Sequence, residues 1–403
     1  MHACGGDILY RLSTEATEAF IGLRRRIHQQ PELAYDEHQT AALVAQRLRD
    51  WGYRVTTGLG GTGVVGQMVK GDGAGRIGLR ADMDALPITE DSGKAWCSQV
   101  PGVMHACGHD GHTAMLLAAA QALAGLNDWS GTLNLIFQPA EEGAGGALAM
   151  MRDGLFAQFP CDRIFAMHNM PGFPQGQLVF RSGPTMASSD YLTVVLHGQG
   201  GHGAMPHRAV DPVVAAASLV MALQTVVSRH TDPLQPAVVT VGALQAGQAN
   251  NVIPAQARLE ISVRTLDPQV REATRARLLE LIDWHARSMG VRAEIEWRDG
   301  YAVLVNDPEQ TRQALAVAQA HFPASQVRAD GPMLTGSEDF AFMLAQVPGC
   351  YLFIGNGEDG QAGGCMVHHP AYDFNDLNIA PGAAYWVALV RALLSPPQPQ
   401  ETT

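Results

Sequence analysis

One stretch of the sequence, residues 109–143, decides the fold: HDGHTAMLLAAAQALAGLNDWSGTLNLIFQPAEEG. It begins with an alanine-rich helical segment and continues into the short apolar run GTLNLIF, which is typical of a buried strand. This strand runs directly into the acidic residues Glu141 and Glu142. A helix followed by a buried strand that ends in charged side chains indicates an open α/β sheet, in which ligands gather at the carboxyl ends of the strands.

Two further apolar runs end in the same way. RIGLRADMD (residues 76–84) delivers Asp82 and Asp84 at its end, and RIFAMHNMP (residues 163–171) delivers His168. Three strand ends therefore supply carboxylates and an imidazole. Because the carboxyl ends of parallel strands meet at one edge of a sheet, we predict that these side chains form one site.

Residues 186–298 follow a different pattern. Strands are expected at 191–197, 237–244, 257–265 and 291–297, and helices at 211–229 and 268–289. This β-α-β-β-α-β order is that of a ferredoxin-like unit. A chain of 403 residues is also too long for one compact core. We therefore predict a catalytic α/β sheet domain formed by residues 1–185 and 299–403, with a ferredoxin-like α+β domain, residues 186–298, inserted into it.

Composition and charge narrow the classes of function. The formal net charge is −12 and no long basic run occurs, which argues against a nucleic-acid partner. The densest basic cluster, LRRRIH at residues 23–28, lies in an amphipathic helical pattern and is expected to form a solvated face. No unbroken run of about 18 apolar residues and no N-terminal signal pattern occur, so we expect a soluble cytoplasmic protein without a membrane partner. The six scattered cysteines are expected to be thiols or a metal ligand rather than a disulfide framework.

Metal-binding side chains are densest in HACGHDGH, where His105, Cys107, His109 and His112 alternate with small residues just before the helix. A histidine in a protein core needs only one partner, so this density of thiol and imidazole groups predicts a metal site. The chain also begins with MHACGGD, but that copy has Gly6 where the internal copy has His109. We interpret the first copy as a chance match in a frayed terminus.

Adjacent carboxylates after a strand can divide their work. Of Glu141 and Glu142, one can ligate a metal ion while the other acts as a general base towards the attacking water; a solvated acidic turn is the alternative. His168 and the pair His368–His369 enlarge the donor set beyond what one tetrahedral ion needs. Cysteine, glutamate and histidine donors with a shared water suit two ions a few Å apart, which activate water and polarise a carbonyl.

Several motifs carry a resemblance to a known family. They are, in chain order, LRADMDALPI, MHACGHDGHTAMLL, QPAEEGAGGALAMMRDG, HNMPGFPQG, GGHGAMPH, NVIP, GSEDFAFM and HHPAYDFND. From about His28 to Leu393 the chain resembles the family of hippurate hydrolase, bacterial N-acyl-L-amino-acid amidohydrolases and plant auxin-conjugate hydrolases. The long motifs are specific, whereas GGHGAMPH alone is moderately so and NVIP alone is weak. The resemblance implies a two-metal amidohydrolase with an inserted dimerisation domain.

The resemblance also assigns residues of the catalytic domain. It implies that the metal ligands are Cys107, His109, Glu142, His168 and His368, and that Glu141 is the general base. His368 is preferred to His369 because family members usually have one histidine, then a variable residue, then proline. Asp84 resembles an acid that orients a ligand, and His105, Asp110 and His112 are expected to support ligands or to cap the helix.

Three residues of the inserted domain are assigned in the same way. His202, in GGHGAMPH, is implied to reach across a dimer and to stabilise the oxyanion of the tetrahedral intermediate; an ordinary surface histidine is the alternative. Asn251 and Arg264 resemble the pair that grips the free α-carboxylate of the substrate. An arginine fork is the natural partner for that group, also in an acidic protein.

The resulting hypothesis is a metal-dependent amidohydrolase that cleaves N-acyl-L-amino acids, whether hippurate-like, N-acetyl or otherwise acylated, into a carboxylic acid and a free amino acid. Two divalent ions per subunit are expected, Zn²⁺ or Mn²⁺, with Co²⁺ and Ni²⁺ as further candidates, in a homodimer or tetramer. A dipeptidase and a deacetylase of acylated diaminopimelate are the alternatives within the hydrolases. Two alternatives are not metal-dependent hydrolases. One is a thiol amidase, with Cys107 as nucleophile and His109 as base, and the other is a metal-binding carrier without turnover.

Overall fold

The computed structural model describes residues 10–395, and the chain divides into two compact units. The first unit comprises Met1–Gly183, Asn306–Pro332 and Phe342–Thr403, and the second comprises Pro184–Val305 and Met333–Ala341. The second unit therefore extends beyond the expected range 186–298, and it takes in a short segment that the sequence pattern assigned to the catalytic domain. The first copy of MHACG lies outside the described residues.

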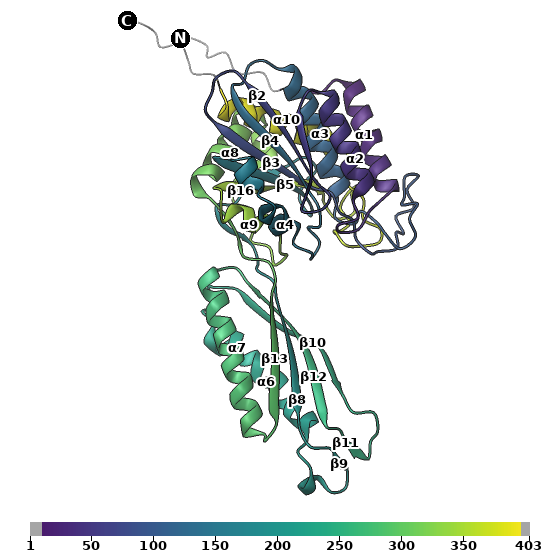
Figure 1. Cartoon of the computed structure of the whole chain (residues 1–403), viewed down its shortest axis with the longest axis vertical. Coiled ribbons are helices and arrows are strands. Elements are labelled where there is room, and N and C mark those ends of the chain that lie inside the picture. Colours follow the sequence, from purple (N-terminus) through teal and green to yellow (C-terminus); the bar gives the residue numbers. More distant parts are fainter. Residues whose placement is uncertain (1–9, 396–403) are drawn as a thin grey trace, which may run out of the picture. The chain divides into compact units, whose positions relative to one another are not determined.

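An eight-stranded sheet forms the centre of the first unit (Figure 1). In spatial order its strands are β1 (Arg54–Leu59), β2 (Gly63–Lys70), β4 (Gly131–Gln138), β3 (Arg76–Asp82), β5 (Arg163–Pro171), β16 (Gly349–Gly357), β6 (Leu178–Val179) and β15 (Val327–Arg328). Strands β3, β4, β5 and β16 run parallel to one another, whereas β1 and β2 extend the sheet in antiparallel fashion. Every residue of β16 is buried, as is typical of parallel strands that are covered on both faces.

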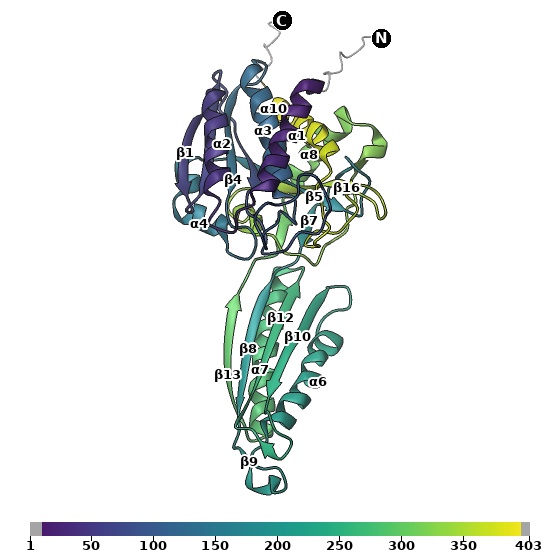
Figure 2. The ribbon, with the colours of Figure 1, turned by 90° about the vertical axis from the view of Figure 1, so that its right-hand side faces the viewer.

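Helices pack around this sheet (Figure 2). They are α1 (Thr14–Gln29), α2 (His38–Asp50), α3 (His109–Gly125), α4 (Gly146–Arg152), α5 (Leu155–Gln158), α8 (Pro308–His321) and α10 (Ile379–Leu393), while α9 (Phe340–Leu344) spans the boundary between the units. Helix α3 contacts β3, β4 and β5, and α1 and α10 pack against it. Gly382 of α10 permits a close approach of α10 to α3, since a Cβ there would lie 2.2 Å from Sδ of Met115 on α3.

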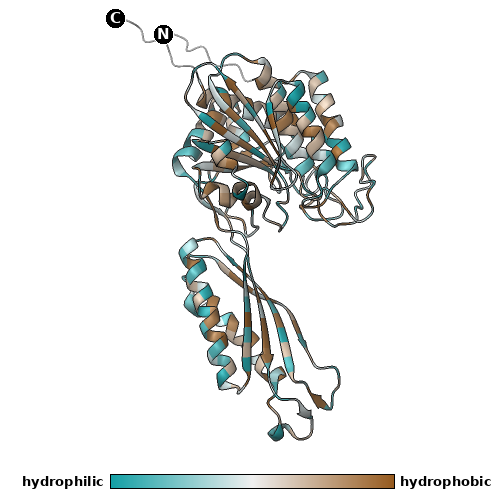
Figure 3. Cartoon of the chain, in the orientation of Figure 1, coloured by the Kyte–Doolittle hydropathy of each residue, from teal (hydrophilic) through white to brown (hydrophobic). Residues whose placement is uncertain are grey.

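The second unit is an antiparallel sheet with two helices. Its main elements are β8 (Asp190–His197), α6 (Pro212–His230), β10 (Ala237–Ala246), β12 (Gln256–Thr265), α7 (Pro268–Ser288) and β13 (Arg292–Asp299). The spatial order β10-β12-β8-β13, with all neighbours antiparallel, makes this β-α-β-β-α-β sequence a ferredoxin-like arrangement. Apolar and polar residues alternate along β12 (Figure 3), and every second residue of this strand is buried. Four short strands complete the chain: β7 (Gly183–Met186), β9 (Gly201–His202), β11 (Val252–Ile253) and β14 (Leu304–Asn306).

Helix α6 is, among residues 10–395, the one helix that is long and apolar enough to cross a membrane, by length and composition only. Ser218, Gln224 and Thr225 interrupt it, so it contains no unbroken apolar run of the kind sought in the sequence. Its inner face, which includes Leu219 and Leu223, is buried in the core of the second unit. The core helix of a globular domain has this pattern.

The basic cluster on α1 is not a solvated face throughout. Arg26 is exposed, but Arg24 and His28 are fully buried, so the expectation for LRRRIH is wrong at these two positions. Buried charges require partners, and Arg24 has three carboxylates around it. Helical periodicity alone could not reveal this, because the partners lie far away in the sequence.

Candidate metal centre

The predicted donor residues come from the ends of β3, β4 and β5, from the start of α3 and from the loop after β16. The structure brings them together. Potential ligand atoms lie within 4.8 Å of one another in each of three groups: Cys107, His109 and His168; Cys107, Glu142 and His368; His109, Glu141 and Glu142. All five residues assigned as ligands, and the assigned base, therefore lie in one cluster of the first unit.

Cys107 is shared by two of these groups. Like the other four cysteines within residues 10–395, it is a free thiol, and its Sγ lies 3.4 Å from His168 Nε2. Burial raises the pKa of the Cys107 thiol well above its usual range, and the carboxylates of Glu142 and Glu141 raise it further. Burial also lowers the pKa of His168, so its imidazole is neutral. A nearby cation is what such a thiol needs in order to ionise.

The cluster fits divalent metal ions by a second observation. Within residues 10–395, His109 Nε2 and Glu142 Oε1 are buried and make no hydrogen bond of good geometry. Buried polar atoms are nearly always satisfied, so two unsatisfied atoms that both belong to the donor groups point to a bound ligand. Thiolate, imidazole and carboxylate are the donors expected for zinc and related metals.

Asp84 orients two members of the cluster. His109 Nδ1 donates to Asp84 Oδ1 at 3.1 Å, which leaves Nε2 for a metal ion, and the Glu142 backbone N–H donates to Asp84 Oδ2 at 2.8 Å. Burial would lower the pKa of His109, but the carboxylates of Asp82 and Asp84 raise it to about 10. Both carboxylate oxygens of Asp84 therefore contact residues of the donor groups, a geometry compatible with a supporting role.

His112 is hydrogen-bonded through both ring nitrogens. Its Nδ1 donates to Asp82 Oδ1 at 2.6 Å, and its Nε2 accepts from the Asn169 backbone N–H at 2.9 Å. Both ring nitrogens therefore have protein partners, although potential ligand atoms of Asp82, His109 and His112 also lie within 4.8 Å of one another. His105 is buried as well, and burial lowers its pKa to about 4, so it is neutral at pH 7.

Asp110 does not cap α3, which corrects one of the expected roles. The N-cap residue is Gly108, whereas Asp110 lies in the first turn. Its carboxylate pairs instead with Arg24 and with His28, at 2.7 and 2.8 Å.

Three residues that hold Cys107 escaped the sequence analysis. Gly108 has φ 88°, and a Cβ there would lie 2.3 Å from Asn169 Nδ2 and 2.4 Å from the Tyr372 hydroxyl. Asn169 Nδ2 donates to the Cys107 carbonyl at 2.7 Å, and the Tyr372 hydroxyl donates to Asn169 Oδ1 at 2.6 Å. The glycine between two candidate ligands and the asparagine next to His168 were the available signals.

Backbone strain is concentrated at the centre. In the described part of the chain, the non-glycine residues with positive φ are Tyr35, Ala140 and His368, with φ of 66°, 55° and 65°. Ala140 precedes Glu141, and His368 is a candidate ligand. Such conformations persist only where the surroundings fix them, as at ligand-binding sites.

The geometry favours His368 over His369. His368 Nε2 lies 3.3 Å from Glu142 Oε1, and the His368 backbone N–H donates to the Ala106 carbonyl at 2.7 Å. The ring of His369 accepts a hydrogen bond from the Ala371 backbone N–H at 3.0 Å, within its own turn.

The second unit holds the remaining predicted residues at opposite ends. His202 on β9 pairs with Val252 on β11, and the Asn251 carbonyl accepts from the Gly203 N–H at 2.8 Å, so these two candidates are neighbours. Arg264 is eight residues beyond Gln256, near the other end of β12, which is about 26 Å at the usual rise per residue. Its Nη1 donates to Ser337 Oγ at 2.9 Å. Within one chain, then, Arg264 does not meet Asn251 or His202.

An α/β sheet with a buried thiol, imidazoles and carboxylates at the carboxyl ends of its strands is the arrangement expected of a metal-dependent hydrolase. Residues 78–392 match Peptidase family M20/M25/M40. The hippurate hydrolase of Campylobacter jejuni is 43% identical over 370 residues, which cover 92% of this chain and 95% of that protein. An N-acetyl-L-cysteine deacetylase of Bacillus subtilis is 37% identical, over 93% of this chain and 88% of that protein.

Solved structures agree with this relationship. A Bacillus subtilis protein described as a dinuclear metal binding peptidase from the M20 family has a TM-score of 0.83 and 30% identity, over 95% of this chain and 99% of that chain. This chain therefore belongs to Peptidase family M20/M25/M40, and it is a metal-dependent amidohydrolase.

Proposed function

We propose that this enzyme hydrolyses the amide bond of N-acyl-L-amino acids and releases a carboxylic acid and a free amino acid. The observation that carries the proposal is the pair of donor groups that share Cys107, with Glu141 beside them. Relatives named for hippurate hydrolysis and for N-acetyl-L-cysteine deacetylation support an acylated amino acid as the substrate.

The proposed ligands of two divalent ions are Cys107, His109, Glu142, His168 and His368. Zn²⁺ and Mn²⁺ are the first candidates, and Co²⁺ and Ni²⁺ also suit this donor set. When bound, such ions activate a water molecule for attack and polarise the carbonyl of the amide.

The protein's own residues move the proton and hold the substrate. Glu141, which is buried beside His109 and Glu142, accepts the proton of the attacking water and delivers it to the departing amino group. Arg264 binds the α-carboxylate through a charge-assisted pair of hydrogen bonds. Asn251 completes the recognition of the substrate, and His202 stabilises the oxyanion.

We further propose that the enzyme works as a homodimer in the cytoplasm. The separation of Arg264 from His202 and Asn251 within the second unit supports this oligomer. One substrate can contact both sets if Arg264 comes from one subunit, while the other two residues come from its partner. Because the dimer is two-fold symmetric, each of its two sites then contains Arg264 from one subunit and the other two residues from the second subunit.

The nearest alternatives are a dipeptidase and a deacetylase of N-acetyl-diaminopimelate, since an N-acetyldiaminopimelate deacetylase of Exiguobacterium sibiricum is 35% identical to this chain. These activities differ in the residues that line the substrate pocket, and not in the proposed catalytic groups. The thiol amidase is disfavoured, because the raised pKa of Cys107 leaves little thiolate without a metal ion.

Hydrolysis is expected to depend strictly on metal. Dialysis against a chelator should abolish turnover, and return of Mn²⁺ or Zn²⁺ should restore it, because in the proposed mechanism Glu141 alone, without metal ions, does not activate the water and polarise the carbonyl sufficiently. Turnover is measured on a panel of N-acetyl, N-benzoyl and indoleacetyl amino acids, with dipeptides and N-acetyl-diaminopimelate included. Full activity in metal-free protein contradicts the proposal, and a preference for the last two substrates selects an alternative.

Arg264→Ala is expected to raise KM for N-acyl amino acids tens-fold, since a charge-assisted contact is worth about 1.5–3 kcal/mol. For substrates whose α-carboxylate is amidated, the same substitution should raise KM little, because the contact with Arg264 is already missing. Arg258→Ala is the matched control, because Arg258 lies on the same strand and pairs with Glu260 on the surface. Equal losses with both kinds of substrate would show that Arg264 has a structural role only.

A further inference from the structure

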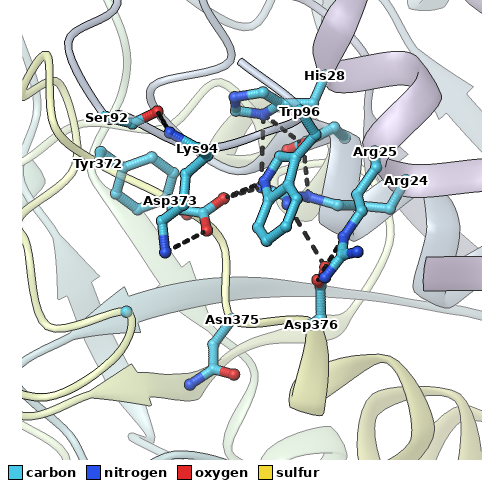
Figure 4. A network of polar contacts seen from close by, with 12 residues as sticks. Arg24, Arg25, His28, Ser92, Lys94, Trp96, Tyr372, Asp373, Asn375 and Asp376 are labelled. Carbon is cyan, nitrogen blue, oxygen red and sulfur yellow. Dashed lines mark hydrogen bonds and ion pairs between the residues drawn. The ribbon is translucent and has the colours of Figure 1, made fainter. Parts of the chain in front are cut away.

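Arg24 on α1 has no part in the proposed chemistry, yet it is fully buried among three carboxylates. Its Nε lies 2.7 Å from Asp110 Oδ2. Its Nη2 lies 2.6 Å from Asp373 Oδ1, and its Nη1 lies 3.4 Å from Asp376 Oδ1 (Figure 4). Burial alone would lower the pKa of Arg24, but Asp110 and Asp373 raise it above its usual value. Nη1 and Nη2 donate hydrogen bonds to Asp376 and Asp373, whereas Nε meets Asp110 as an ion pair without a well-directed hydrogen bond. A planar guanidinium suits such a three-way junction better than the single ammonium group of lysine.

The carboxylates belong to two segments that carry proposed metal ligands. Asp110 directly follows His109 at the start of α3. Asp373 and Asp376 lie five and eight residues after His368, in the segment between β16 and α10. Arg24 therefore joins the segment of one ligand to the segment of another.

The α3 side of this junction has a second support. His28 Nδ1 lies 2.8 Å from Asp110 Oδ2, and His28 Nε2 lies 3.3 Å from Glu90 Oε1. Burial would lower the pKa of His28, but Asp110 raises it to about 9, so the imidazole is charged at pH 7. Asp110 would thus keep a buried cationic partner without Arg24.

The His368 side is anchored by the buried side chains of Tyr372 and Phe374, but among the described residues its two carboxylates have no second buried cationic partner. Apart from Arg24, Asp373 contacts Trp96 Nε1 at 3.2 Å and the exposed Lys94 Nζ at 3.4 Å. Asp376 is shared with Arg25, whose guanidinium is partly exposed and lies 3.6 Å from the centre of the Trp96 ring (Figure 4). Exposed pairs of this kind contribute little. The segment also contains the strained backbone of His368, which only its surroundings hold in place.

We propose that Arg24 is a positioning residue of the metal centre. By holding the segment that follows His368, it sets the affinity for the ion to which His368 contributes. The ion to which His168 contributes depends less on Arg24, because His168 lies on β5 within the central sheet. This inference rests on the proposed dinuclear centre and concerns how one of its two ion sites is held together.

Titration of the metal-free, full-length protein with Co²⁺ tests the inference, with calorimetry and the absorption of the cobalt–thiolate bond as readouts. Wild-type protein should bind two ions. Arg24→Met should retain one step at the wild-type affinity and weaken the other about tenfold or more, as is typical when a group that orients a ligand is removed. His368→Ala and His168→Ala identify the steps, and Arg24→Met should resemble the former. Arg24→Lys should fall between Arg24→Met and wild type.

Arg26→Met is the matched control, because Arg26 is exposed on the same helix. This variant should bind both ions with the wild-type affinities. If circular dichroism shows that Arg24→Met is unfolded, Asp373→Asn removes the contact from the partly buried side and should give the same selective loss. Normal binding of both ions by a folded variant overturns the inference. Equal weakening of both steps also overturns it, since that result indicates a general structural role. Fewer than two ions in the wild-type protein would contradict the dinuclear centre itself.

Discussion

Glu141→Gln is expected to lower kcat by about 10²–10⁴-fold while the protein keeps both metal ions. The amide of glutamine nearly matches the carboxylate in size but cannot accept the proton of the attacking water. None of the five proposed ligands is changed, so the ions should stay bound. The measurement is kcat on the best substrate of the panel, together with the metal content of the same preparation.

Glu142→Gln is the matched control for this substitution. It alters the adjacent carboxylate, which belongs to the donor group of Cys107 and His368, and it should therefore reduce metal content as well as rate. Near-normal turnover of Glu141→Gln would assign the base to another residue. Loss of metal from Glu141→Gln would instead make Glu141 a ligand.

The gathering of the site was predictable because strand ends have a fixed geometry. Strand β3 lies between β4 and β5 and is parallel to both, so residues that follow the carboxyl ends of these strands lie at one edge of the sheet. Apolar runs that end in acids or histidine could therefore be recognised one by one. The elements of the second unit were equally visible, because its strands alternate apolar and polar residues while its helices do not.

The burial of Arg24 could not be predicted in that way. A charged residue in a helical pattern is ordinarily on the solvated side, and only distant partners reverse this expectation. Those partners are Asp110, Asp373 and Asp376, which lie 86 to 352 residues away in the sequence. Gly108 was hidden for a related reason, since the groups that exclude a side chain there come from β5 and from the loop after β16.

The relationship between Arg264 and Asn251 was also beyond the sequence. They are thirteen positions apart, which is compatible with a shared binding pocket. The intervening strand β12 is extended, however, and extension carries Arg264 to the end of the sheet where the chain enters the second unit. Asn251 remains beside His202 at the opposite end. A single chain cannot place all three on one small substrate, and this supports a site shared between subunits.

Two inactive variants, His202→Ala and Glu141→Gln, are expected to recover activity when their chains are mixed in one dimer. In a mixed dimer the His202→Ala chain keeps its own Glu141 and receives the intact His202 of the partner subunit, so one of the two sites is complete. Random pairing makes about half of the dimers mixed, which gives about a quarter of wild-type activity. Co-expression with two different affinity tags isolates the mixed dimers, whose activity is compared with that of each parent.

The alternative arrangement predicts the opposite result. If His202 served the site of its own chain, every site in the mixed dimer would lack either His202 or Glu141, and the mixture would stay as inactive as its parents. Purified mixed dimers without recovery would therefore refute the shared site. A further variant, Asn251→Ala, sharpens the test because Asn251 neighbours His202 in the second unit. Asn251→Ala should restore activity when it is paired with Glu141→Gln. It should not do so when it is paired with His202→Ala, because each site of that dimer then lacks one of the two residues.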